Sequence, residues 1–149
     1  MKILLVEDNV SEADLTREAL LEAGIPHELS VVQDGEGAIE FLRNEGVCGN
    51  AAMPDIILLD LNMPRKGGLE VLSEIKGDVG LCRVPVIVVS NSQAIEDIDA
   101  VYQLGGNSYL VKCGDLDQYF ASVKALVEFW MRTARLPSVS RGCQPVGLP

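Results

Sequence analysis

Two short runs decide the fold of this chain: Ile56-Ile57-Leu58-Leu59-Asp60 and Val86-Ile87-Val88-Val89-Ser90. Each is an unbroken series of branched aliphatic residues that ends on a polar residue. Central strands of a parallel sheet have this pattern, because helices cover both faces of the sheet and every side chain is buried. We therefore expect both runs to lie in the middle of a parallel sheet.

Three further strand candidates accompany these runs, and helical patterns separate all five. The expected strands are 2–7, 27–32, 55–60, 85–90 and 107–112, and the expected helices lie near 11–23, 35–45, 67–77, 94–104 and 116–134. Asn9 or Ser11 can cap the first helix, and Asp115 or Gly114 the last, by accepting hydrogen bonds from unpaired backbone N–H groups. The regular alternation of strands and helices predicts an α/β fold with helices on both faces of the sheet.

Length and composition indicate one globular unit. The 149 residues are 48% hydrophobic and 23% charged, which is ordinary for a domain with a packed core. Residues 135–149 are rich in Pro, Gly and Ser and have no hydrophobic period. We expect a domain over residues 1–134, followed by a flexible tail over residues 135–149.

Charge and cysteine content exclude several classes of function. The 22 acidic and 12 basic residues give a net charge of −10, which disfavours direct contact with nucleic acid. The apolar run at the N-terminus is too short for a signal peptide or a membrane span, so we expect a cytoplasmic protein with no membrane partner. Four scattered cysteines and a single histidine, His27, favour reduced thiols over a zinc site or disulfides.

Polar side chains follow four of the five expected strands. Glu7 and Asp8 end the first strand and Asp60 ends the third. Ser90 ends the fourth strand and Lys112 the fifth. Ligands of open parallel sheets gather outside the carboxyl ends of the strands, so we expect these side chains to converge on one site.

The three acids at this edge point to metal and phosphate chemistry. Carboxylates brought together raise one another's pKa unless a cation neutralises them, and hard oxygen ligands suit Mg²⁺. Mg²⁺ sites are often completed by phosphate oxygens, so the nearby Lys112 favours a phosphoryl site with Asp60 as the nucleophile. Taken singly, each residue has an ordinary explanation, such as Glu7 and Asp8 favouring the positive end of a helix dipole. The joint pattern favours the site.

Four segments of the chain resemble the receiver domains of two-component response regulators, and the similarity extends from residue 2 to about residue 130. The segments are Leu-Leu-Val-Glu-Asp-Asn at 4–9, Ile-Ile-Leu-Leu-Asp-Leu-Asn-Met-Pro at 56–64, Val-Ile-Val-Val-Ser at 86–90 and Ser-Tyr-Leu-Val-Lys at 108–112. The spacings from Asp60 to Ser90 and from Ser90 to Lys112 are also typical of the family. The resemblance implies a flavodoxin-like, doubly wound sheet of five parallel strands in the order 2-1-3-4-5, with five flanking helices.

The same resemblance implies a role for each residue of the site. Asp60 would accept a phosphoryl group from the phosphohistidine of a sensor histidine kinase, with Mg²⁺ bound by Glu7, Asp8, Asp60 and the backbone carbonyl of Asn62. Lys112 would pair with the phosphoryl oxygens. The protein would be a phosphoacceptor and not an enzyme, apart from self-phosphorylation by small donors and autodephosphorylation.

Two switch residues are implied in addition. Ser90 would turn its hydroxyl toward the phosphoryl group, and Tyr109 would swing inward into the vacated space. Phosphorylation adds a charge close to −2, which can bias a surface between two states.

A narrower resemblance concerns the small regulators paired with bacterial and cyanobacterial phytochromes. It is based on Asn-Met-Pro-Arg-Lys-Gly-Gly at 62–68, Glu-Phe-Trp at 128–130 and Leu-Pro at 136–137. It implies a single-domain regulator that forms homodimers through the fourth helix, fifth strand and fifth helix, with the C-terminal extension contributing. Its signal would pass to a downstream target protein or a phosphorelay.

One departure and two alternatives stand beside this interpretation. Cys113 follows Lys112 where receivers usually have proline, and a cis peptide before a non-proline residue costs ~2.5–4 kcal/mol, so we expect the Lys112–Cys113 peptide to be trans or strained.

One alternative is a pseudo-receiver that binds proteins without phosphorylation, which the complete set of site residues disfavours. The other is a flavin-binding or hydrolytic enzyme. It lacks support because no Gly-rich loop follows the first strand and His27 is the only histidine.

Overall fold

A computed structural model describes residues 1–47, 53–112 and 114–137. Strands and helices alternate along these residues as the sequence predicts. The strands are β1 (Lys2–Val6), β2 (Glu28–Val32), β3 (Ile56–Leu59), β4 (Val86–Ser90) and β5 (Ser108–Val111). The helices are α1 (Val10–Glu22), α2 (Gly35–Val47), α3 (Gly68–Gly77), α4 (Ile95–Gln103) and α5 (Leu116–Glu128), and α5 continues into the π-helical turn η1 (Phe129–Thr133).

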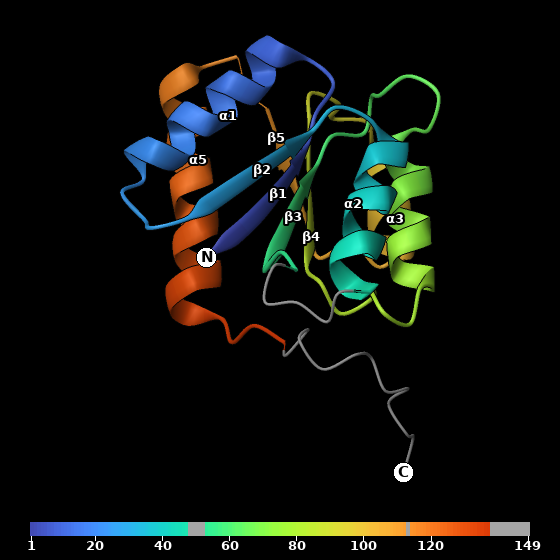
Figure 1. Cartoon of the computed structure of the whole chain (residues 1–149). Coiled ribbons are helices and arrows are strands. Elements are labelled where there is room, and N and C mark those ends of the chain that lie inside the picture. The colour runs from blue at the N-terminus through green and yellow to red at the C-terminus, as the bar shows by residue number, and fades with distance from the viewer. Residues whose placement is uncertain (48–52, 113, 138–149) are drawn as a thin grey trace.

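The five strands form one parallel sheet in the order β2-β1-β3-β4-β5, which confirms the predicted flavodoxin-like topology. Helices α1 and α5 cover one face of the sheet, and α2 and α3 cover the other (Figure 1). Most boundaries agree with the prediction to within one or two residues. Glu7, Asp60 and Lys112, expected as the last residues of strands, lie one position beyond β1, β3 and β5, so their side chains stand at the edge of the sheet.

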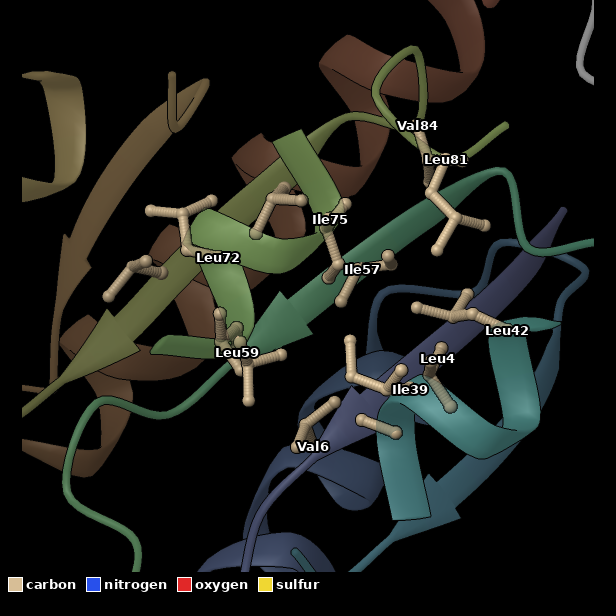
Figure 2. Close-up of a cluster of buried hydrophobic side chains, with 14 of the residues drawn as sticks. Leu4, Val6, Ile39, Leu42, Ile57, Leu59, Leu72, Ile75, Leu81 and Val84 are labelled. Atoms are coloured by element: carbon tan, nitrogen blue, oxygen red, sulfur yellow. The ribbon is translucent and has the colours of Figure 1, made fainter. Parts of the chain in front are cut away.

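Side chains of the sheet alternate between two hydrophobic clusters. On β3, Ile57 and Leu59 pack toward α2 and α3, whereas Ile56 and Leu58 pack toward α1 and α5. Figure 2 shows the first cluster, in which the two β3 residues contact apolar side chains of the neighbouring elements. Every residue of β3 and β4 is buried, as predicted for mid-sheet strands. Burial of each Leu, Ile or Val side chain contributes roughly 1.5–3 kcal/mol.

Side-chain caps fix the start of the first and last helices. The Asn9 side chain accepts a hydrogen bond from the Glu12 N–H at 3.0 Å. The Asp115 side chain accepts from the Asp117 and Gln118 N–H groups. Asn9 and Asp115 are each one of the two predicted caps for their helix. Loss of such a cap typically costs about 1 kcal/mol. The cap on α1 matters for the site, because it determines where the first turn of α1 lies relative to β1.

The loop after β3 approaches the start of α3 very closely. A Cβ atom on Gly68 would lie 2.6 Å from the Cα atom of Leu61, so only glycine fits at this position. The Gly68 N–H donates to the Leu61 carbonyl at 3.0 Å. This contact holds the backbone that carries Asp60 against the first turn of α3.

Some predictions fall on residues that the structure does not describe. Cys113 and residues 138–149 lie outside the described ranges, so the geometry of the Lys112–Cys113 peptide and most of the expected tail cannot be compared with the structure. The domain boundary at residue 134 and the flexible tail over residues 135–149 stay predictions. Cys82, the one cysteine within the described ranges, carries a free thiol. Among the described residues, no helix is both long and apolar enough to cross a membrane.

Candidate functional site

The three acids at the edge of the sheet converge as predicted. Glu7, Asp8 and Asp60 each place a carboxylate oxygen within 4.8 Å of the others. Backbone pairing produces this arrangement, because β1 and β3 are neighbours and the Asp60 N–H donates to the Val6 carbonyl at 3.0 Å. Glu7 and Asp60 are only 2% and 6% exposed, whereas Asp8 is partly exposed. The cluster therefore has two buried acids and one acid that faces the solvent.

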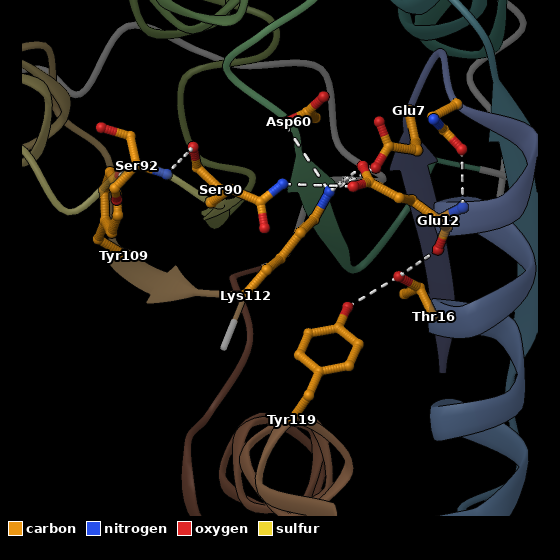
Figure 3. A network of polar contacts seen from close by, with 11 residues as sticks. Glu7, Glu12, Thr16, Asp60, Ser90, Ser92, Tyr109, Lys112 and Tyr119 are labelled. Carbon is orange, nitrogen blue, oxygen red and sulfur yellow. Dashed lines mark hydrogen bonds and ion pairs between the residues drawn. The ribbon is translucent and has the colours of Figure 1, made fainter. Parts of the chain in front are cut away.

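Lys112 reaches this cluster from β5. Its backbone N–H donates to the Ser90 carbonyl at 2.8 Å, which fixes the residue beside the end of β4. Its ammonium nitrogen lies 2.5 Å from Glu7 Oε1 and 3.9 Å from Asp60 Oδ1 (Figure 3). A further acid, Glu12, accepts from the same ammonium at 2.8 Å. Lys112 thus pairs more closely with the two glutamates than with Asp60.

Burial sets the electrostatics of Glu7. Its removal from water raises the pKa of the carboxyl, and a hydrogen bond with Asp60 raises it further, while Lys112 opposes both, so that the pKa reaches about 8. The Oε2 atom of Glu7 is buried and has no hydrogen-bond partner among the described residues. A divalent cation between the three carboxylates would supply the missing partner and the missing positive charge. The donor set therefore fits a hard metal ion.

Burial has the opposite effect on Lys112, because it disfavours the charged ammonium. Desolvation lowers the pKa of Lys112, but hydrogen bonds to Glu12 and Glu7 and the charge of Asp60 outweigh it and raise the pKa. Lys112 therefore carries its positive charge at neutral pH.

Asn62, whose backbone carbonyl is the fourth predicted metal ligand, lies in the loop after β3, and its role as a ligand stays a prediction.

The two predicted switch residues contact the same loop residue (Figure 3). Ser90 is fully buried at the end of β4, and its hydroxyl oxygen accepts from the Ser92 N–H at 3.1 Å. Tyr109 is partly buried on β5, and its hydroxyl donates to the Ser92 carbonyl at 2.8 Å. Ser92 thus joins both residues within the β4–α4 loop. Their motions on phosphorylation stay predictions.

Glu12 is a site residue that the sequence reasoning missed. It lies in the first turn of α1 and accepts from Lys112 through Oε2 and from the Asn91 amide at 3.3 Å through Oε1. The hydrogen bond from Lys112 is the main reason that the pKa of Glu12 is lowered. An acid in the first turn of a helix is already explained by the helix dipole, so the sequence alone gives it no further significance.

The sheet order and the acidic edge define a parallel α/β receiver. Residues 3–124 match the family model of the response regulator receiver domain. The chain is 43% identical over 136 residues to response regulator Rcp1 of Synechocystis sp.. These aligned residues span 91% of this chain and 92% of the relative. It is 36% identical to the probable methanogenesis regulatory protein FilR2 of Methanothrix harundinacea, with 91% and 86% covered. The chain belongs to the response regulator receiver family.

Solved structures narrow the similarity to one group within this family. The phosphorylated cyanobacterial phytochrome response regulator RcpA matches with a TM-score of 0.84 and 50% identity, over 92% of this chain and 98% of that one. The Mn²⁺-bound form of Rcp1 matches with a TM-score of 0.82 and 42% identity, over 92% and 99%. The chain therefore resembles the response regulators of phytochromes, as its sequence motifs predict.

Proposed function

We propose that this chain is a response regulator that accepts a phosphoryl group on Asp60 from a sensor histidine kinase, with Mg²⁺ bound beside it. The observation that carries the proposal is the convergence of Glu7, Asp8 and Asp60 with the ammonium of Lys112 at the carboxyl edge of the sheet. Metal-ligating oxygens, a nucleophilic carboxylate and a fixed positive charge are the parts that phosphoryl transfer requires.

The transfer itself is simple in covalent terms. An Asp60 oxygen forms a bond to phosphorus while the bond from phosphorus to the imidazole nitrogen of the donor breaks, and that nitrogen keeps the electron pair. When bound by Glu7, Asp8, Asp60 and the Asn62 carbonyl, Mg²⁺ would neutralise charge on the phosphoryl oxygens. Lys112 would move toward the same oxygens. The chain turns over no external substrate in this scheme beyond self-phosphorylation and autodephosphorylation.

The signal would leave the site through the β4–α4 loop. The phosphoryl group brings a charge close to −2 and new acceptor oxygens. The Ser90 hydroxyl would donate to one of these oxygens and give up its contact with the Ser92 N–H. Tyr109, whose hydroxyl is held by the Ser92 carbonyl, would then move inward. The surface formed by α4 and β5 would change as a result.

The kinase partner follows from the resemblance to phytochrome regulators. The name of RcpA describes it as a phytochrome response regulator, and it is 50% identical to this chain. We infer that a phytochrome-type sensor kinase phosphorylates Asp60. A downstream target protein or a phosphorelay would receive the signal.

The chemical test uses a small donor in place of the kinase. Incubation with acetyl phosphate and Mg²⁺ should add the mass of one phosphoryl group, and Asp60→Asn should abolish the gain. Asp14→Asn, which changes an exposed acid on α1, serves as the matched control and should retain it. A wild type that gains no mass would favour the pseudo-receiver, in which the chain binds proteins without phosphorylation.

A second part of the proposal is a homodimer formed through α4, β5 and α5. A groove between β5 and α5 is lined by apolar side chains that include Leu110, Leu126 and Trp130. Phe129 lies at the same groove and is 49% exposed, and Tyr102 on α4 is 51% exposed. A second copy of the chain would cover these side chains. Light scattering with and without beryllofluoride tests this, and a monomer in both states would contradict it.

A further inference from the structure

Two glutamates already engage the Lys112 ammonium, which is proposed to pair with a phosphoryl group on Asp60. Its nitrogen is 2.5 Å from Glu7 and 2.8 Å from Glu12, but 3.9 Å from Asp60. A metal ion at the acidic cluster would compete for the Glu7 carboxylate. Glu12 is not one of the three acids of that cluster, so its contact with Lys112 does not compete directly with the ion. Lys112 thus has one partner that the metal leaves in place.

Several contacts fix Glu12 where it meets Lys112. Its backbone N–H donates to the Asn9 side chain at 3.0 Å, and its carbonyl accepts from the Thr16 hydroxyl at 3.1 Å. The Thr16 hydroxyl also bonds to the buried Tyr119 hydroxyl at 2.8 Å, which fastens this turn of α1 to α5. The carboxylate itself is shared between Asn91 and Lys112. Glu12 is therefore a positioned acid and not a freely moving surface side chain.

We propose that Glu12 is a positioning residue that engages the Lys112 ammonium in the unphosphorylated protein and thereby lowers the affinity of the site for a phosphoryl group. The inference rests on the proposed function, because it concerns phosphoryl binding at Asp60. To pair fully with phosphoryl oxygens on Asp60, the Lys112 ammonium has to loosen its contact with Glu12 at 2.8 Å. The negative charge of Glu12 also opposes the arrival of a dianion nearby.

The contact with Asn91 relates Glu12 to the switch loop as well. Asn91 directly follows Ser90, the residue proposed to turn toward the phosphoryl group. If the loop shifts when the Ser90 hydroxyl gives up its contact with the Ser92 N–H, the amide that donates to Glu12 Oε1 would shift with it. The unphosphorylated arrangement of the loop and the restraint on Lys112 support each other in this way.

The test is a comparison of beryllofluoride binding in the presence of Mg²⁺, measured by calorimetry on the full chain. Glu12→Gln keeps the size of the side chain and removes its charge, so it should bind beryllofluoride about threefold to tenfold more tightly than the wild type, as expected for loss of one charge contact. Glu18→Gln makes the same change on the exposed side of α1 and should bind as the wild type does.

Mg²⁺ binding without beryllofluoride separates this role from a merely structural one. Loosening of α1 would weaken the binding of both Mg²⁺ and beryllofluoride. Release of Lys112 should instead strengthen beryllofluoride binding and leave Mg²⁺ binding no tighter than in the wild type. Equal or weaker beryllofluoride binding by Glu12→Gln would overturn the inference, and so would a gain that is matched by tighter Mg²⁺ binding.

Failure of the inference is distinct from failure of the proposed function. A wild type that binds beryllofluoride and is phosphorylated on Asp60 supports the proposed function whatever Glu12→Gln does. A wild type that does neither contradicts the proposed function, and the inference about Glu12 then falls with it.

Discussion

The candidate site has two halves that are built in different ways. The carboxylate half consists of Glu7, Asp8 and Asp60, which directly follow the paired strands β1 and β3. The switch half consists of Ser90, Tyr109 and Lys112, which are held by side-chain contacts with loops and with α1. Paired strands set the backbone of both halves, but in the second half exchangeable hydrogen bonds determine where the side chains lie. The difference matches the proposed roles, since one half has to hold a metal ion and the other has to move.

The largest expected effect comes from the strand that carries the carboxylate half. Ile57 is fully buried on β3, so Ile57→Ala should lower the free energy of unfolding by about 3–4 kcal/mol, through lost burial and the cavity left behind. Leu110 on β5 is only partly buried, and Leu110→Ala should cost roughly 1–2 kcal/mol. Urea unfolding measures both. Equal losses at the two positions would contradict the distinction between a rigid centre and a looser edge.

The next effect concerns pH and metal binding. Burial first, and then the hydrogen bond with Asp60, raises the pKa of Glu7 from 4.5 to about 8 in the metal-free protein. A metal ion needs the deprotonated carboxylate, so Mg²⁺ affinity should rise by about tenfold per pH unit from pH 6 and level off above pH 8. Calorimetry at several pH values measures this. Glu7→Gln should bind Mg²⁺ more weakly, and its dependence on pH over this range should be much smaller.

The same raised pKa determines the sign of its contribution to stability. In the unfolded chain Glu7 loses its proton near 4.5, whereas in the metal-free folded protein it keeps the proton to about 8. Its contribution to folding is therefore fully present below pH 4.5 and is lost as the pH rises through 8. Saturating Mg²⁺ should remove this loss, because the ion binds the deprotonated folded state. The assignment would be contradicted if Glu7 made no contribution to the pH dependence of the stability of the metal-free protein between pH 4.5 and 8.

The same contrast explains what the sequence could predict. β3 and β4 are continuous apolar runs, and the acids that follow paired strands must lie at one edge, so the fold and the carboxylate half follow from the pattern. The partners of Lys112 do not follow in this way. Its contact with Glu12 joins residues 100 positions apart through two long side chains, and the Thr16–Tyr119 bond joins residues 103 apart. Such contacts depend on rotamers and on the placement of whole helices.

The smallest expected effect lies in the switch half. Tyr109→Phe removes the hydroxyl that donates to the Ser92 carbonyl, and it should lower the free energy of unfolding by no more than about 1 kcal/mol, because the ring is only partly buried. The local effect should be clearer. Amide exchange at Ser92, whose N–H donates to Ser90, should be roughly twofold to tenfold faster, since the loop opens more easily.

Tyr102→Phe is the matched control for this change, since Tyr102 is 51% exposed on the neighbouring helix α4. It should leave the exchange of the Ser92 amide unchanged. Unchanged exchange in Tyr109→Phe as well would mean that Ser90 and the backbone hold the loop without the tyrosine. In that case Tyr109 would not restrain the loop in the unphosphorylated protein, and the contrast between the two halves would apply to Ser90 and Lys112 alone.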